Sequence, residues 1–215
     1  MPEEEAKALQ ELAKFGSKAL DSSDKLGSFL SRVFGTVPAD VIGVVGGDWL
    51  HHVRIRNAAR LTYRTEEILR ERGILEETKP MSPSVALPLL HAAQDETRDE
   101  LAEMWARMLA NGMDPNRSRL VRQSIIDTVA SLEPTDAITL QESFDKAPEP
   151  GKQAIFEDLR AELRVSSDEL KLSIDNLSKL GCIDGTSFRQ EGGIETIIGV
   201  SLSSLGREVV RACSL

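Results

Sequence analysis

The feature that most constrains the fold of this chain is a stripe of apolar residues that begins at Leu101. The stripe recurs at intervals of three and four residues and consists of Leu101, Met104, Trp105, Met108 and Leu109. This spacing puts all of them on one face of a helix and leaves charged residues on the other face. The sequence therefore predicts an amphipathic helix whose apolar face belongs to the core of a helical domain.

Both ends of this helix carry capping signals. Thr97 and Glu100 have the T-x-x-E spacing of a capping box, in which each side chain accepts a hydrogen bond from the other residue's backbone amide. Beyond the stripe, Asn111 and Gly112 tolerate a left-handed backbone, and Pro115 cannot continue a helix. We expect the helix to begin just after Thr97 and to end between Asn111 and Pro115.

Further helix signals surround this segment. Ser82 followed by Pro83 is typical of a helix N-terminus, while Pro88 must kink or restart that helix because its ring removes an interior hydrogen bond. Another apolar stripe spans residues 120–132, and Pro134 opens the next helix. Four short helices within about sixty residues predict a compact all-α bundle.

The segment KAPEPGK, residues 146–152, is the strongest domain boundary because its prolines and glycine separate two compositions. After it, the pattern reads helix, helix, two extended runs and a short helix, which is the order of a winged helix. The predicted fold class is mainly α, with a helical bundle followed by a small C-terminal winged-helix-like α+β domain. The predicted divisions are an N-terminal helix over 1–26, the bundle over 27–146 with its core at 80–141, and the winged-helix-like domain over 152–215.

Charge weighs against nucleic-acid binding, which a winged helix otherwise suggests. The chain has a formal net charge of -9, and residues 166–200 contain three basic and six acidic residues. This segment is therefore acidic where a DNA-binding surface carries clustered Lys and Arg. We expect the domain to make protein contacts, with a nucleic-acid-binding regulator as the alternative.

The sequence favours a cytoplasmic protein. Its first residues, MPEEEAKALQEL, are acidic where a secretory signal peptide is basic. The apolar run at 33–47 is interrupted by Pro38 and Asp40, and a spanning helix needs about twenty mostly apolar residues. Cys182 and Cys213 form no C-x-x-C pair, as expected for reduced thiols in a cytosolic protein. Association with a membrane surface on activation is an open alternative.

One cationic patch follows this apolar run. It consists of Arg54, Arg56, Arg60 and Arg64, which fall within eleven residues that contain no acid. On a helix, Arg56, Arg60 and Arg64 share a face and form a ridge suited to the phosphates of lipid or nucleic acid. The alternative is a solvated helix face paired with acidic surface elsewhere. The four arginines are therefore candidates for contact with an anionic partner.

No catalytic, cofactor-binding or metal-binding residue can be assigned from the sequence. His51, His52 and His91 lack partners at metal-ligand spacing, and no Ser, Cys or Lys belongs to a nucleophile motif. One cluster of carboxylates fits a helix start better than an acid–base pair, and it consists of Asp95, Glu96, Asp99 and Glu100. We expect a protein that is not an enzyme and needs no cofactor, with an enzyme of unrecognised site as the alternative.

Several segments together resemble the bacterial family known as abortive infection alpha, the DUF4393 domain. They are VALPLLHAA after Ser-Pro-Ser, then ELAEMWARMLANGMDP, then SLEPTDAITL, in the order that the family uses. The similarity extends upstream to GGDWLHHVRIRNAARLTYRTEEILRERGI and downstream to SLSSLGREVVRAC, over residues 40–213. The resemblance implies a role in phage defence and carries no catalytic residue onto this sequence.

These observations together predict a non-enzymatic phage-defence factor that acts through protein or membrane contacts. A protein partner or a homo-oligomer is expected. A membrane surface is the alternative partner, and nucleic acid is disfavoured.

Overall fold

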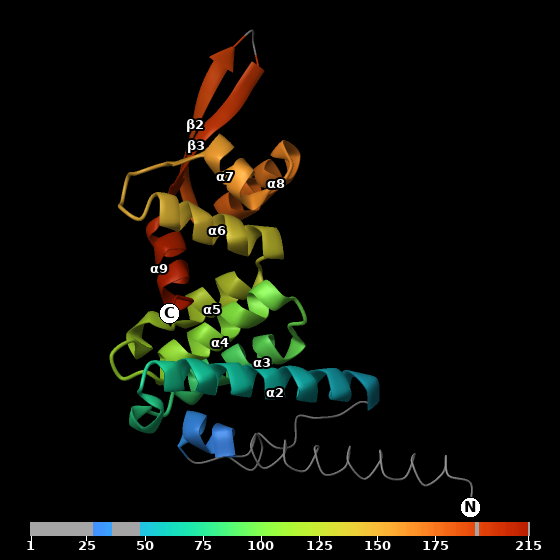
Figure 1. Cartoon of the computed structure of the whole chain (residues 1–215), viewed down its shortest axis with the longest axis vertical. Helices are drawn as coiled ribbons and strands as arrows, with labels where there is room; N and C mark the ends of the chain where they lie inside the picture. The colour runs from blue at the N-terminus through green and yellow to red at the C-terminus, as the bar shows by residue number, and fades with distance from the viewer. Residues whose placement is uncertain (1–27, 36–47, 192–193, 215) are drawn as a thin grey trace, which may run out of the picture.

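The computed structural model of the chain describes residues 28–35, 48–191 and 194–214. The helix predicted over 1–26 and most of the apolar run at 33–47 lie outside these residues. Within them the chain is mainly helical, with a small antiparallel sheet in its C-terminal part, which confirms the predicted fold class (Figure 1). No helix in the described ranges has the length and apolar character needed to cross a membrane. The likeness to a winged helix and the predicted domain divisions stay predictions.

The elements follow one another along the described chain with short connections. Helical residues 28–34 come first. The longer helices are α2 (Asp48–Glu71), α3 (Pro83–Asp95), α4 (Asp99–Met113), α5 (Gln123–Ala130), α6 (Pro134–Lys146), α7 (Phe156–Leu163), α8 (Ser167–Lys179) and α9 (Ser204–Ala212). The short 3-10 helices are η2 (Leu75–Glu77) and η3 (Ser118–Leu120), and the strands are β1 (Ala154–Ile155), β2 (Ile183–Glu191) and β3 (Ile194–Leu202).

Helix α4 lies at the centre of the helical part, in contact with α2, α3, α6 and α9 (Figure 1). Its apolar face buries Leu101, Trp105, Met108 and Leu109, and Met104 packs half-buried at the edge of the core. Burying a large apolar side chain contributes about 1.5–3 kcal/mol to folding. The spacing that makes α4 amphipathic therefore determines where the core forms.

The N-terminus of α4 is capped differently from the prediction. Arg98 is the N-cap residue, and its side chain makes no capping hydrogen bond. Instead, Glu96 Oε1 accepts hydrogen bonds from the backbone amides of Thr97 and Arg98 at 2.9 and 2.8 Å. The predicted capping box of Thr97 and Glu100 is therefore wrong, because a carboxylate that precedes the helix satisfies the free amides at its entrance.

The C-terminus of α4 lies within the predicted stop segment, at the second of its two signals. The helix continues through Asn111 and Gly112 to Met113, and Asp114 is its C-cap residue. Asn111 is fully buried, and a Cβ at Gly112 would overlap the side chain of Met81. Tertiary contacts thus require these two residues inside the helix and override their local tendency to end it.

The proline-led helices begin where the sequence predicts. Pro83 lies in the first turn of α3 after the N-cap residue Ser82, and Pro134 opens α6 in the same way. Pro88 lies inside α3, which continues to Asp95 as one helix. The sequence predicts that Pro88 either kinks this helix or starts a new one. The start of a new helix at Pro88 is therefore wrong.

The C-terminal part contains a three-stranded antiparallel sheet in the order β1-β3-β2. The β2–β3 hairpin projects beyond the helices (Figure 1). The order helix, helix, hairpin, helix agrees with the prediction. The sequence does not predict strand β1. Its residues Ala154 and Ile155 pair with Val200 and Gly199 just before α7 begins.

A buried polar contact ties the C-terminal segment to α4. Asn111 Nδ2 donates to the carbonyl oxygens of Ala212 and Ser214 at 2.9 and 3.0 Å. Asn111 Oδ1 accepts from Arg72 Nη1 at 2.8 Å and from Arg117 Nη1 at 3.3 Å. Buried polar groups need such partners. Asn111 therefore fixes the end of α9 against the bundle.

The start of α9 approaches the backbone just before β2. The Ser203 Oγ accepts from the Gly206 amide at 3.0 Å and donates to the Gly181 carbonyl at 2.6 Å. A Cβ at Gly206 would overlap the carbonyl oxygen of Cys182. Glycine is therefore the residue that permits this close approach of helix and backbone.

Candidate binding site between α2 and α4

The predicted cationic ridge lies along α2, which packs beside α3 and α4. Arg60 pairs with Asp99 at 2.8 Å, and Arg64 pairs with Glu103 at 2.8 Å. Both pairs join residues 39 apart, so the two helices run in the same direction. The ridge thus meets a row of carboxylates on a neighbouring helix.

The other two arginines of the cationic patch differ from each other. Arg54 donates to both carboxylate oxygens of Asp95, from Nε at 2.6 Å and from Nη2 at 3.1 Å. The hydrogen bonds to Asp95 raise the pKa of Arg54. Arg56 is exposed, and no ion pair within the described ranges includes it. Contact of the four arginines with an anionic partner stays a prediction.

Arg64 is held by two carboxylates. Its Nε and Nη2 donate to Glu103 at 2.8 Å, and its Nη1 donates to Glu67 at 2.6 Å. Arg107 Nε also donates to Glu103, at 2.8 Å. The hydrogen bond from Arg64 holds the pKa of Glu103 below its ordinary value against the opposing effect of burial, and Arg107 adds to it. Glu103 is therefore ionised at neutral pH and fully engaged.

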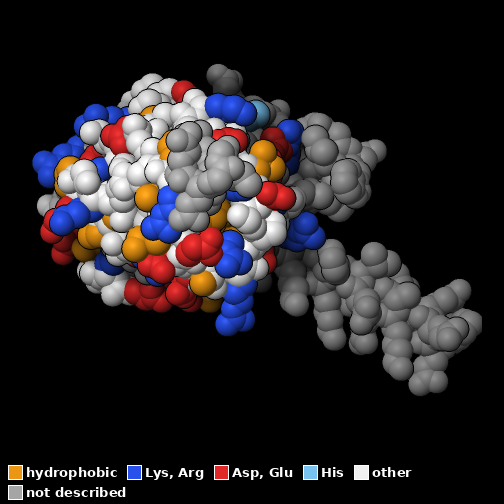
Figure 2. All heavy atoms as spheres, turned by 90° about the horizontal axis from the view of Figure 1, so that it is seen from above, with side chains coloured by type: hydrophobic (Ala, Val, Ile, Leu, Met, Phe, Trp, Pro, Cys, Tyr) orange, Lys and Arg blue, Asp and Glu red, His pale blue; other side chains and the backbone are white. Residues whose placement is uncertain are grey.

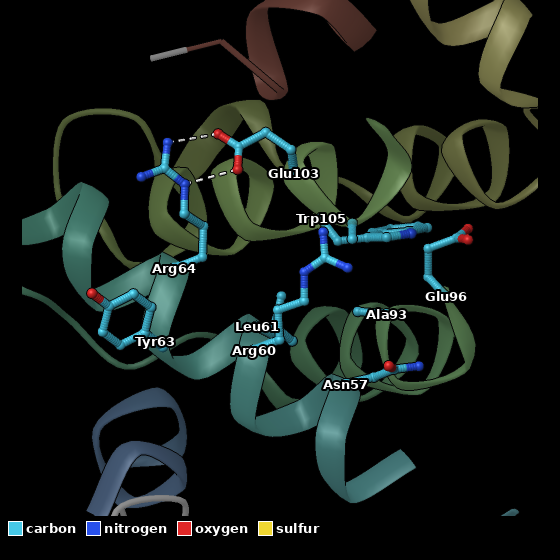
Figure 3. Close-up of a pocket in the computed structure, with 10 residues that line it drawn as sticks. Asn57, Arg60, Leu61, Tyr63, Arg64, Ala93, Glu96, Glu103 and Trp105 are labelled. Carbon is cyan, nitrogen blue, oxygen red and sulfur yellow. Dashed lines mark hydrogen bonds and ion pairs between the residues drawn. The ribbon is translucent and has the colours of Figure 1, made fainter. Parts of the chain in front are cut away.

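A pocket of about 230 Å³ lies between α2, the C-terminal end of α3 and α4 (Figure 3). The residues that line it are Asn57, Arg60, Leu61, Tyr63, Arg64, Ala93, Glu96, Ala102, Glu103 and Trp105. Part of the wall is apolar, formed by the Trp105 ring with Leu61 and two alanines. Tyr63 is among the most exposed large hydrophobic residues described, at 68%.

The charges of the pocket are held to different degrees. Burial favours the neutral form of Glu96, but hydrogen bonds from the side chain and backbone of Arg98 outweigh it and leave the pKa of Glu96 below its ordinary value. Arg98 Nε lies 2.9 Å from Glu96 Oε1. Arg60, in contrast, pairs with Asp99, a side chain that is 83% exposed. Arg60 is therefore the loosely held cation of the pocket.

The cysteines lie outside this pocket, and both are buried free thiols. Burial raises the pKa of Cys182 to about 11 and that of Cys213 to about 12. Nucleophilic cysteines have lowered pKa values, so neither thiol suits nucleophilic chemistry, and both pack in the hydrophobic core. Among the described residues, no group of three or more His, Cys, Asp or Glu could hold a metal ion.

The end of the molecule that carries the β2–β3 hairpin presents charges of both signs. Figure 2 shows Lys and Arg side chains intermixed with Asp and Glu on this face. In α8, Lys171 lies 3.8 Å from Asp168. The nucleic-acid-binding alternative stays a prediction.

Sequence reasoning found the arginines of this site and missed how they are paired. A signal was present, because Arg60 and Arg64 are four residues apart, as are Asp99 and Glu103. Equal spacing lets two such ion pairs form side by side if the helices are neighbours, whichever way they run. Tyr63 carries no such pattern, and only the fold places it at the pocket.

Fold and site together define a class: a mainly helical protein with a small C-terminal sheet and a charge-paired pocket between parallel helices. A family model described as abortive infection alpha matches residues 56–213, and the chain belongs to this family. The match confirms the resemblance seen in the sequence. No curated protein and no solved structure matches the chain at a significant level.

Proposed function

We propose that this protein is a cytoplasmic phage-defence factor of the abortive infection type, and that it acts by binding a partner protein and not by catalysis. Membership of the abortive infection alpha family supports the defence role. The state of the carboxylates in the pocket supports a binding role. A general acid or base needs a pKa near the working pH, whereas Glu96 and Glu103 have lowered pKa values and are engaged by arginines.

The contact surface that we propose is the exposed stripe of α2. Arg56, Arg60 and Tyr63 follow one another at intervals of four and three residues, so they share one helix face, and all three are exposed. Arginine and tyrosine are enriched among the residues that carry most of the binding energy at protein interfaces. If the partner is a membrane surface instead, the same stripe contacts the anionic lipid headgroups.

The experiment is restriction of phage growth in bacteria that express the full chain. Reversal of all four arginines would also break the ion pairs of Arg54, Arg60 and Arg64, so a loss of function would not locate the contact surface. The better variant is Arg56→Glu combined with Tyr63→Ser. Its matched control is Arg70→Glu, which makes the same charge change at an exposed position of the same helix.

We expect the Arg56→Glu, Tyr63→Ser variant to lose restriction while its melting temperature stays close to that of the wild type. We expect the Arg70→Glu control to restrict phage normally. Normal restriction by the double variant would refute the α2 surface. Binding of the wild type, but not of the variant, to anionic vesicles would assign the same stripe to a membrane instead of a protein.

A further inference from the structure

Two arginines converge where the end of α9 meets the bundle. Arg72 follows the last residue of α2, and Arg117 is the N-cap residue of η3. Both donate from Nη1 to Asn111 Oδ1, at 2.8 and 3.3 Å, and both donate to the Ser214 carbonyl, at 3.3 and 3.4 Å. These shared acceptors hold the two guanidinium groups next to each other.

The charge of the two arginines is only partly balanced by the protein. The shared acceptors, an amide oxygen and a backbone carbonyl, are neutral. Asp114 lies 3.8 Å from Arg72, whereas no ion pair within the described ranges includes Arg117. Burial lowers the pKa of Arg72, and the neighbouring charge of Arg117 lowers it further. An excess of positive charge therefore remains at two half-buried side chains.

Arg117 also has hydrogen-bond donors to spare. The Nε and Nη2 of an arginine point the same way and together bind two oxygens of one anion. Arg64 uses both atoms in this way on Glu103. Arg117 donates from Nη1 alone, and its Nε and Nη2 have no hydrogen-bond partner among the described residues and are not buried. This bidentate edge of Arg117 therefore faces solvent.

The surroundings of the edge favour an anion. The bonds of Nη1 already restrict the Arg117 side chain, so binding costs less conformational entropy than it does at a free surface arginine. Residues 115–126 contain three arginines and no acid. Two of these arginines, Arg119 and Arg122, are exposed. Their charge raises the local concentration of anions.

We propose that Arg117 binds a phosphate group through its Nε and Nη2, with Arg72 beside it. A phosphate ester carries a charge of about -1.5 to -2 at neutral pH, which matches two neighbouring arginines better than the single charge of a carboxylate does. This inference goes beyond the proposed defence function and does not depend on it. The group can come from inorganic phosphate or from a small phosphate ester, and the probes separate these two sources.

The test is isothermal titration calorimetry of the full chain in a phosphate-free buffer. The probes are inorganic phosphate and glycerol phosphate. Acetate supplies a single negative charge, and sodium chloride at the same ionic strength controls for screening. We expect saturable binding of inorganic phosphate or glycerol phosphate with a Kd below about 10 mM, and much weaker binding of acetate. Binding of inorganic phosphate alone would assign the site to the free ion, and binding of both would assign it to the phosphate group.

Three variants decide whether the site is the one described. Arg117→Gln should weaken binding by about tenfold or more, as expected for the loss of charge-assisted hydrogen bonds. Arg117→Lys keeps the charge without the bidentate edge, so its affinity should lie between those of Arg117→Gln and the wild type. Arg119→Gln is the matched control, because it removes the same charge from an exposed residue nearby. It should bind within about twofold of the wild type.

Melting temperatures in phosphate-free buffer show whether each variant is folded, and Arg117→Lys decides the matter if Arg117→Gln is not. No saturable binding by the wild type, unchanged binding by the Arg117 variants, or equal losses in Arg117→Gln and Arg119→Gln would each overturn the proposal. Binding that appears only when several glycines are added after Leu215 would show that a carboxylate of the chain itself fills the site, and would also overturn it. None of these outcomes bears on phage restriction, which the growth experiment measures separately.

Discussion

Replacing Asn111 with alanine would remove the side chain that joins the end of α9 to α4. The Ala212 carbonyl would lose the donor at 2.9 Å. Arg72 would lose its acceptor at 2.8 Å and keep the Ser214 carbonyl at 3.3 Å and Asp114 at 3.8 Å. A buried polar group left without a partner costs about 1–3 kcal/mol. With the Ala212 carbonyl left without this donor, we expect Asn111→Ala to lower the free energy of unfolding by about 1–3 kcal/mol.

Urea unfolding followed by circular dichroism measures this loss. With a denaturant slope of about 2 kcal/mol/M, the midpoint should fall by about 0.5–1.5 M. Asn116→Ala is the matched control, because Asn116 is exposed and bonds Asp114 through its backbone amide. The control should stay within about 0.5 kcal/mol of the wild type.

Hydrogen exchange locates the effect of Asn111→Ala in the molecule. The α9 amides should exchange faster in the variant, because the helix has lost its attachment at one end. The α2 amides should respond less under conditions where exchange occurs by local opening. If Asn111→Ala and Asn116→Ala are equally stable, or if α9 protection is unchanged, Asn111 does not hold the C-terminal segment.

Three further predictions concern pH, thiol chemistry and backbone contact. The pKa of Glu103 is lower in the folded state than its unfolded value of about 4.3. Ionised Glu103 therefore stabilises the fold above about pH 4.3, and this stabilisation is lost as pH falls through the folded pKa. Thermal melts should therefore show a shallower decline below about pH 5 in Glu103→Gln than in the wild type, and equal slopes would contradict this. Cys182 and Cys213 should react slowly with a disulfide reagent at about pH 8 in the native protein, because both thiols are buried and their pKa values are raised. In about 6 M urea they should react rapidly. Equal rates in the two conditions would show that the thiols are accessible in the native protein. Gly206→Ala should lower the free energy of unfolding in urea by about 2 kcal/mol or more, because the new Cβ overlaps a backbone oxygen. Gly185→Ala is the control and should cost under about 1 kcal/mol, because the nearest atom to its new Cβ is 3.6 Å away. Similar losses in the two variants would refute the steric argument.

The helical part of the fold is readable from sequence because periodicity and helix starts are local properties. The apolar spacing of α4 and the prolines that open α3 and α6 place these elements correctly. The sequence predicts only part of the pairing between the arginines and the carboxylates. Arg60 and Arg64 match the spacing of Asp99 and Glu103, but no local rule says that α2 and α4 are neighbours.

The errors arise where distant residues decide the local structure. Asn111 and Gly112 are the first of two predicted stop signals, and the helix passes through them. Asn111 bonds residues more than a hundred positions away, and Gly112 makes room for Met81. Thr97 reads as a cap, yet Arg98 is the N-cap residue, and Glu96 already accepts from the Thr97 amide that the Glu100 side chain would serve in a capping box. The pocket likewise depends on which side chains of three helices meet, which a single sequence does not state.

The attachment of α9 has a consequence for synthesis on the ribosome. The bonds from Asn111 to Ala212 and Ser214 span 101 and 103 residues, whereas the Arg64–Glu103 pair spans 39. At a translation rate of about 5–20 residues per second, α2 and α4 can join roughly 5–20 s before the partners of Asn111 emerge. During that interval the surface that α9 later covers faces water. The nascent chain, rather than the finished protein, is therefore the form in which this face is open to chaperones or to aggregation.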